Sequence, residues 1–220
     1  MRIAIHDGDC GMTNFPNLAL MRISQVMKDR GHSVEWYDAL LDYSHPYDQV
    51  YSSSVFTFSN KDQYLPEGTI RGGTGYGLFA SRHFFDLSKP DYSIYPNFKH
   101  ALGFCTRGCI RECPWCIVPR KEGKISFDTA ISAICDGKKS VVLMDNNFLA
   151  HDFHCSELAW CVDTQTKVDF NQGLDARLVN EENADLLARC KWIRFVRFSC
   201  DRVENMDSVA HAVTLLRNAG

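Results

Sequence analysis

The chain has 220 residues, of which 45% are hydrophobic, and a formal net charge of −3 at pH 7. This length and composition suffice for one or two domains with a buried core, and the slightly acidic balance does not indicate a nucleic-acid partner. The sequence has neither the apolar core of a secretory signal nor an apolar run of about 20 residues. We therefore expect a soluble, cytoplasmic protein without membrane contact.

Strand and helix signals alternate in residues 1–90. A helix is predicted over residues 17–31, with Asn17 as its N-cap and Gly31 at its end. A glycine-rich turn is expected at residues 72–77. The predicted strands cover residues 2–5, 32–38 and 49–59. This alternation predicts an α/β domain with a Rossmann-like open parallel sheet.

A second run of alternating signals covers residues 98–220. It follows residues 86–98, which contain two prolines, show little periodicity and are predicted to form a linker. Four successive β/α units are predicted after it. The predicted strands cover residues 100–104, 140–144, 167–172 and 193–199. The predicted helices cover residues 126–137, 155–163, 180–190 and 203–220, with Ser126 and Asn180 as N-caps of the first and third.

Polar segments follow each of these four strands. They are residues 105–123, 145–148, 171–177 and 199–202. In β/α barrels, ligands lie at the carboxyl ends of the strands. We therefore expect the four segments to contribute to one common site.

The first of these segments is rich in cysteine. The chain has ten cysteines, and in a reducing cytosol clustered cysteines are more often metal ligands or catalysts than disulfides. Cys109, Cys113 and Cys116 form a Cys-x3-Cys-x2-Cys pattern, with Cys105 four residues upstream. Three thiolates on one tight loop suit a 4Fe–4S cluster, whose fourth iron then stays open to a substrate or cofactor. Cys105 ends an apolar strand and is interpreted as a neighbour of the loop.

A closed metal site is the alternative interpretation. Cys105 could complete a four-thiolate zinc or iron–sulfur site, which would make the chain a non-enzymatic metal protein. A zinc ion could also recruit His151, His154 or Cys155.

The segment Cys109-Ile-Arg-Glu-Cys113-Pro-Trp-Cys116 resembles the signature of the radical S-adenosylmethionine (radical SAM) enzymes. The resemblance implies a partial (β/α) radical SAM barrel over residues 98–220, with a 4Fe–4S cluster on the three cysteines. It also implies reductive cleavage of S-adenosylmethionine to a 5'-deoxyadenosyl radical, which abstracts hydrogen from a substrate. An external electron donor such as flavodoxin or ferredoxin is implied as a partner. The substrate is not identified.

The same resemblance implies a set of cofactor-binding residues. Trp115, just before the third cysteine, would face the adenine. The segment after the second strand would lie near the methionine amino group of the cofactor, and the later strand ends would contact its ribose and carboxylate. The residues at these places are Asp145, Asn146 and Asn147 for the former, and Gln172, Arg177, Ser199 and Asp201 for the latter.

The first domain resembles the cobalamin-binding Rossmann domains that precede some radical SAM enzymes. The Asp-x-His-x-x-Gly motif that supplies a cobalt ligand is missing after the first strand, where residues 6–11 read His-Asp-Gly-Asp-Cys-Gly. We therefore predict this fold without cobalamin. Residues 117–123 also resemble the methylthiotransferases, a second alternative. Those enzymes carry another cluster on three N-terminal cysteines, whereas this domain has only Cys10.

Overall fold

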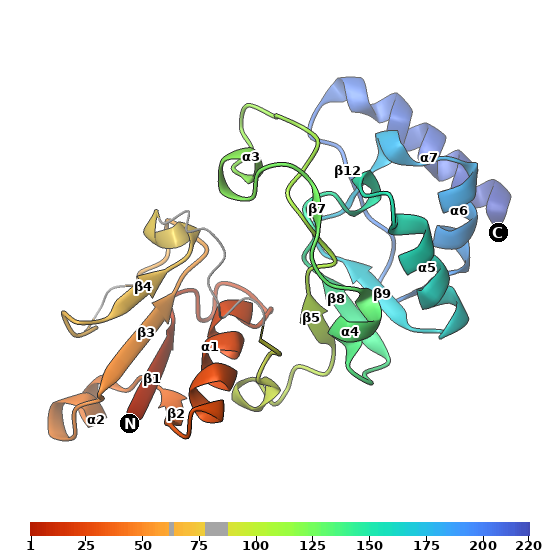
Figure 1. Ribbon diagram of the computed structural model, residues 1–220. Helices are drawn as coiled ribbons and strands as arrows, with labels where there is room; N and C mark the ends of the chain where they lie inside the picture. Colours follow the sequence, from red (N-terminus) through yellow and green to blue (C-terminus); the bar gives the residue numbers. More distant parts are fainter. Residues whose placement is uncertain (62–63, 78–87) are drawn as a thin grey trace. The chain divides into compact units, whose positions relative to one another are not determined.

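The computed structural model describes residues 1–61, 64–77 and 88–220 (Figure 1). The chain divides into two compact units, Met1–Phe98 and Lys99–Gly220. Each unit contains a four-stranded parallel sheet. No helix within the described ranges is long and apolar enough to cross a membrane.

The first unit is an open parallel sheet with the strand order β2-β1-β3-β4. Its strands are β1 (Arg2–Asp7), β2 (Ser33–Trp36), β3 (Gln49–Ser53) and β4 (Ile70–Gly72), and its helices are α1 (Leu18–Asp29) and α2 (Ala39–Ser44). As predicted, the Asn17 side chain caps α1, by accepting a hydrogen bond from the Leu20 N–H. The Rossmann-like parallel arrangement is confirmed. Strand β4 was not predicted, and its last residue, Gly72, is the first residue of the predicted turn.

The strand predicted over residues 49–59 was too long, because β3 ends at Ser53. The buried Asp9 carboxylate accepts hydrogen bonds from the Val55 and Phe56 backbone N–H groups, at 2.5 and 3.3 Å. It also accepts hydrogen bonds from the hydroxyls of Ser54 and Ser59. These contacts turn the chain away from the sheet. The pKa of Asp9 is lowered, because the hydrogen bonds outweigh the effect of burial.

Residues 88–98, part of the predicted linker, belong to the first unit. The Asp91 carboxylate lies 2.6 Å from both Ser24 Oγ and Lys28 Nζ, which are on α1. Burial raises the pKa of Asp91, but these hydrogen bonds outweigh it and lower the pKa to about 2. A short 3₁₀ turn, Tyr92–Ile94, follows. Residues 86 and 87 lie outside the described residues.

The second unit is built on a parallel sheet with the strand order β11-β9-β8-β5. These strands are β5 (Ala101–Gly103), β8 (Ser140–Leu143), β9 (Lys167–Phe170) and β11 (Lys191–Trp192). Two short strands, β10 (Leu174–Asp175) and β12 (Phe198–Ser199), form a separate parallel pair. The predicted parallel sheet is confirmed, and its closure into part of a barrel stays a prediction.

Helices follow the strands of the second unit in the predicted alternation. They are α4 (Ile131–Cys135), α5 (His154–Asp163), α6 (Glu181–Arg189) and α7 (Met206–Ala219). A further short helix, α3 (Val118–Lys121), lies within the cysteine segment and was not predicted. Figure 1 shows α5, α6 and α7 side by side, and these helices contact one another in that order. Buried apolar side chains such as Leu143, Leu158 and Leu187 join the strands to this helical layer.

Two predictions for the second unit were wrong. Ser126 does not cap a helix: it pairs with Arg107 in an antiparallel hairpin of β6 (Thr106–Arg107) and β7 (Ser126–Phe127). The helix therefore begins only at Ile131. The strand predicted over residues 193–199 is also divided, because the chain leaves β9 after Ile193 and pairs with β10 from Phe198.

The N-cap of α6 provides a test of the fold. Asn180 Oδ1 accepts the Asn183 N–H, and Asn183 Oδ1 accepts the Asn180 N–H, both at 2.9 Å. Because Asn180→Ala removes the cap, we expect the free energy of unfolding to fall by about 1 kcal/mol, measured by urea denaturation. Asn205→Ala is the matched control, since Asn205 precedes α7 without a side-chain cap hydrogen bond. An equal loss in both variants would contradict the capping argument.

Candidate functional site

The cysteine loop leaves the sheet after β5 and is closed at its base by the protein backbone. Thr106 and Arg107 pair with β7, and the Cys109 N–H donates to the Gly123 carbonyl at 3.2 Å. Gly108 lies between these contacts with a φ of +79°, and a Cβ there would lie 2.3 Å from the Lys124 carbonyl oxygen. Only glycine fits at this position. The loop Gly108–Lys124, here called the cluster loop, therefore has a fixed base.

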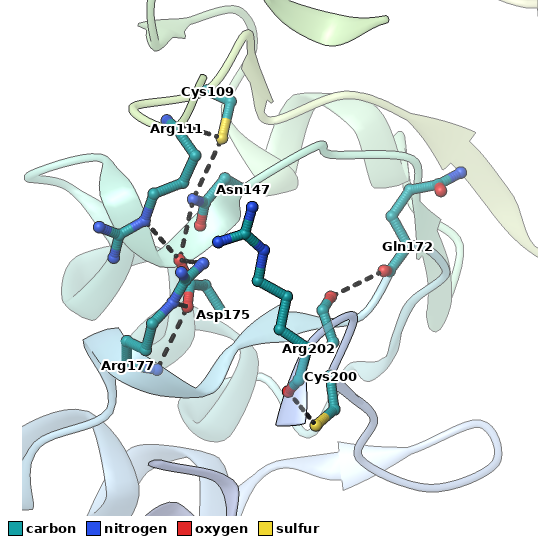
Figure 2. Close-up of polar contacts among 9 residues, drawn as sticks. Cys109, Arg111, Asn147, Gln172, Asp175, Arg177, Cys200 and Arg202 are labelled. Atoms are coloured by element: carbon teal, nitrogen blue, oxygen red, sulfur yellow. Dashed lines mark hydrogen bonds and ion pairs between the residues drawn. The ribbon is translucent and has the colours of Figure 1, made fainter. Parts of the chain in front are cut away.

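The three predicted ligands lie on the cluster loop as half-buried free thiols. Cys109 Sγ accepts hydrogen bonds from the Arg111 backbone N–H at 3.3 Å and from Asn147 Nδ2 at 3.4 Å (Figure 2). The Cys116 N–H donates to the Cys113 carbonyl at 2.9 Å, which forms a turn. N–H donors to sulfur stabilise a thiolate, the form of cysteine that binds metals.

Cys105 lies in a different environment. It is 1% exposed and belongs to the core of the second unit, with Ala101 and Cys161. Burial raises the pKa of the Cys105 thiol, and Asp145 adds to this shift. A buried neutral thiol suits the interpretation of Cys105 as a small apolar side chain.

The side chains of the cluster loop are not arranged around a metal position. In residues 1–61, 64–77 and 88–220, no three His, Cys, Asp or Glu side chains form a group that could hold a metal ion. The assignment of a cluster to Cys109, Cys113 and Cys116 stays a prediction. The donor set itself fits an iron–sulfur cluster, because three thiols lie on one short loop and one of them already accepts two N–H hydrogen bonds.

Asp175 connects the cluster loop to the strand ends. Its carboxylate, at the end of β10, accepts hydrogen bonds from Arg111 Nε at 3.0 Å and from Asn147 Nδ2 at 3.5 Å. Arg177 donates to it through Nε and Nη2, at 2.6 and 2.9 Å. Asn147 Nδ2 thus lies between the Asp175 carboxylate and Cys109 Sγ (Figure 2). Three segments far apart in sequence meet at this carboxylate.

The positive charges of Arg111 and Arg177 explain how Asp175, which is only 8% exposed, stays ionised. Burial raises the pKa of Asp175, but the hydrogen bonds and positive charges of Arg177 and Arg111 outweigh it, and the pKa lies below its ordinary value. The pKa of Arg177 is raised, mainly by the hydrogen bond to Asp175 and further by the negative charge of that carboxylate.

The Asp145 side chain joins two segments of the second unit. Its buried carboxylate accepts hydrogen bonds from the Cys105 and Thr106 N–H groups, at 3.1 and 2.5 Å, and from Thr106 Oγ1 at 2.7 Å. It therefore ties the end of β8 to the segment that leaves β5. Burial outweighs these hydrogen bonds and raises the pKa of Asp145 to about 6.

The two asparagines after Asp145 have polar atoms that the described structure leaves unpaired. Asn146 Nδ2 and Asn147 Oδ1 are buried without a hydrogen-bond partner among the described residues. Asn147 is only 3% exposed, so an unpaired amide oxygen there is costly unless a ligand completes it. Asn147 Oδ1 is therefore an acceptor suited to an N–H or O–H donor. A cavity of about 410 Å³ also borders the cluster loop beside Cys109.

Trp115 is exposed and lies under a guanidinium group. Arg202, which follows β12, places its Cζ atom 4.7 Å from the centre of the Trp115 ring, in cation–π geometry. Figure 2 shows the Arg202 side chain extending toward Asn147 and Asp175. Arg202 was not among the predicted site residues, although it directly follows one of them, Asp201.

The remaining predicted residues take less part in this arrangement. Figure 2 shows the Gln172 side chain pointing away from Asp175, while its backbone carbonyl accepts a hydrogen bond from Ser199 Oγ at 3.4 Å. Asp201 is exposed. The structure thus brings together Cys109, Asn147 and Arg177, and it adds Arg111, Asp175 and Arg202. The polar segments after the strands contain Asp175 and Arg202, but their individual contacts cannot be read from the sequence.

No family model and no curated protein matches the chain. A solved structure does: the radical S-adenosylmethionine methyltransferase TsrM from Kitasatospora setae, with cobalamin and a [4Fe-4S] cluster bound. The match has a TM-score of 0.65 and 13% sequence identity, and it covers 100% of this chain and 67% of that chain. At this identity the likeness shows the fold alone. The chain therefore has an α/β fold similar to that of a radical SAM enzyme.

The titration of Asp145 yields a pH prediction. Its pKa is about 6 in the folded chain, well above the ordinary value of an aspartate, so the folded chain takes up a proton before the unfolded chain as the pH falls. Protonation of Asp145 therefore raises the free energy of unfolding as the pH falls through 6. This contribution is lost as the pH rises through 6. From pH 7 to pH 5, we expect the free energy of unfolding of the wild type to rise by about 1 kcal/mol relative to Asp145→Asn. Urea denaturation at both pH values measures this difference, and a constant difference would contradict it.

Proposed function

We propose that the chain is a radical SAM enzyme whose cluster loop binds a 4Fe–4S cluster through Cys109, Cys113 and Cys116. One observation carries the proposal. The Cys-x3-Cys-x2-Cys loop leaves the carboxyl end of β5, in a fold similar to that of a radical SAM methyltransferase. When bound, the cluster would supply the electron that cleaves S-adenosylmethionine to methionine and a 5'-deoxyadenosyl radical. We further propose that the second unit is a partial barrel around this site.

The residues of the chain would hold and orient the two cofactors. The backbone base of the cluster loop positions the three thiols, and the N–H groups of Arg111 and Asn147 stabilise the Cys109 thiolate. The unpaired Asn147 Oδ1 would accept a hydrogen bond from the methionine ammonium group. This contact would satisfy a buried acceptor, which supports Asn147 as a binding residue.

Charge and aromatic surface suit the rest of S-adenosylmethionine. Arg111 and Arg177 share the Asp175 carboxylate, so their combined charge exceeds its own by one unit. Arg202 adds a further positive charge at the Trp115 ring. This excess favours a carboxylate ligand, and the exposed face of Trp115 could pack on the adenine. We propose Asn146, Gln172, Ser199 and Asp201 as further contacts, an external electron donor as partner, and an unidentified substrate.

The closed four-cysteine site is less favoured. Cys105 would have to leave the core, where it is 1% exposed, to join the other three thiols. The methylthiotransferase alternative has no support in the first unit, because a second cluster there would have only Cys10 as a ligand.

Iron loading and cofactor cleavage test the proposal. We expect the anaerobically reconstituted full chain to bind about four irons and, with dithionite, to form 5'-deoxyadenosine from S-adenosylmethionine. Cys113→Ala should lose at least tenfold in cleavage activity and show a marked fall in bound iron, because the cluster loses a ligand.

Cys105→Ala is the matched control, because the same substitution removes a thiol from the core instead of the loop. We expect its iron content and its cleavage rate to stay close to those of the wild type. Normal iron loading of Cys113→Ala would overturn the proposal. Loss of the metal in Cys105→Ala, with the fold retained by circular dichroism, would favour the closed four-thiolate site.

A further inference from the structure

Cys109 has a distinct environment among the three loop cysteines, and this inference rests on the function proposed above. In the part of the chain that the structure describes, Cys109 is the loop thiol whose Sγ accepts N–H hydrogen bonds. One donor is local, the Arg111 backbone. The other is Asn147 Nδ2, which comes from a different strand end 38 residues away.

The Asn147 amide group links Cys109 to a buried negative charge. Its Nδ2 atom lies 3.4 Å from Cys109 Sγ and 3.5 Å from Asp175 Oδ2. Both residues are more than nine-tenths buried. Electrostatic interactions at such depth are stronger than in water. Changes at either residue should therefore act on Cys109 with little screening.

The amide and the carboxylate have opposite effects on a reducible cluster. A hydrogen bond to a ligand sulfur withdraws electron density and favours the reduced cluster, which raises the reduction potential. A nearby carboxylate disfavours the added electron and lowers the reduction potential. The positive charges of Arg111 and Arg177 oppose this effect of the carboxylate, so removal of either arginine should lower the potential.

We propose that Asn147 and Asp175 are positioning residues that set the reduction potential of the cluster through Cys109, in opposite directions. Asn147 raises the potential by donating to the sulfur. Asp175 lowers it through its charge and holds the Asn147 amide group in place. The balance between them sets how readily the cluster accepts an electron from its donor.

The test is a potentiometric titration of the reconstituted full chain, followed by electron paramagnetic resonance without S-adenosylmethionine. Asn147→Leu keeps the volume of the side chain but removes its N–H groups, so the midpoint potential should shift downward. Asp175→Asn removes the charge, so the midpoint potential should shift upward. Asp185→Asn is the matched control: Asp185 also pairs with an arginine, but on the exposed face of α6, and no shift is expected.

Further variants separate electrostatics from structural damage. Asp175→Glu keeps the negative charge, so its midpoint potential should stay close to that of the wild type. If Asp175→Asn does not fold, as judged by circular dichroism, Arg111→Gln takes its place. It keeps the backbone N–H donor to Cys109 but removes a positive charge, and the midpoint potential should fall.

The outcomes distinguish this inference from the proposed function. Opposite shifts in Asn147→Leu and Asp175→Asn support it. Shifts of the same sign, or unchanged potentials in variants that bind the cluster, overturn it while the enzyme function stands. Failure of the wild type to form a cluster on its three loop cysteines overturns the proposed function itself.

Discussion

The parallel pairing of β8 with β5 on one side and β9 on the other is the constraint on which the second unit depends. Val142, for example, lies opposite Leu102 in β5 and Asp169 in β9. Parallel strands end at the same edge, so the chain after each strand emerges at one place. The cluster loop, Asn147 and Asp175 meet there because the strands before them run in one direction. The buried carboxylates of Asp145 and Asp175 then hold these segments together through hydrogen bonds.

The two buried carboxylates at this edge have different roles. Asp145 accepts hydrogen bonds from neutral backbone and hydroxyl groups, and burial keeps its pKa above the ordinary value. Asp175 lies between two guanidinium groups, which keep its pKa below the ordinary value. Asp145 therefore joins two segments of the fold, and Asp175 places charge beside the loop thiols. The opposite pKa shifts of Asp145 and Asp175 come from their different hydrogen-bond partners, since both side chains are almost fully buried.

Local signals explain which features could be predicted from the sequence. Asn17 and Asn180 cap their helices as expected, because a cap depends on residues only three positions away. Ser126 has the same local signal, but pairing with Arg107 across the loop overrides it. The cysteine spacing is also local and identifies the loop. Asp175 was missed because its importance comes from Arg111, 64 residues away, and only the folded chain brings them together.

The base of the cluster loop has a consequence for how a metal cluster would be acquired. Gly108, the β6–β7 pairing and the Cys109–Gly123 hydrogen bond close the loop with backbone contacts alone. These contacts fix both ends of the loop, so the conformational entropy of its base is lost when the chain folds. If the loop binds a cluster as proposed, binding would have to order only the thiol-bearing tip, in contrast to zinc fingers, which fold around their metal.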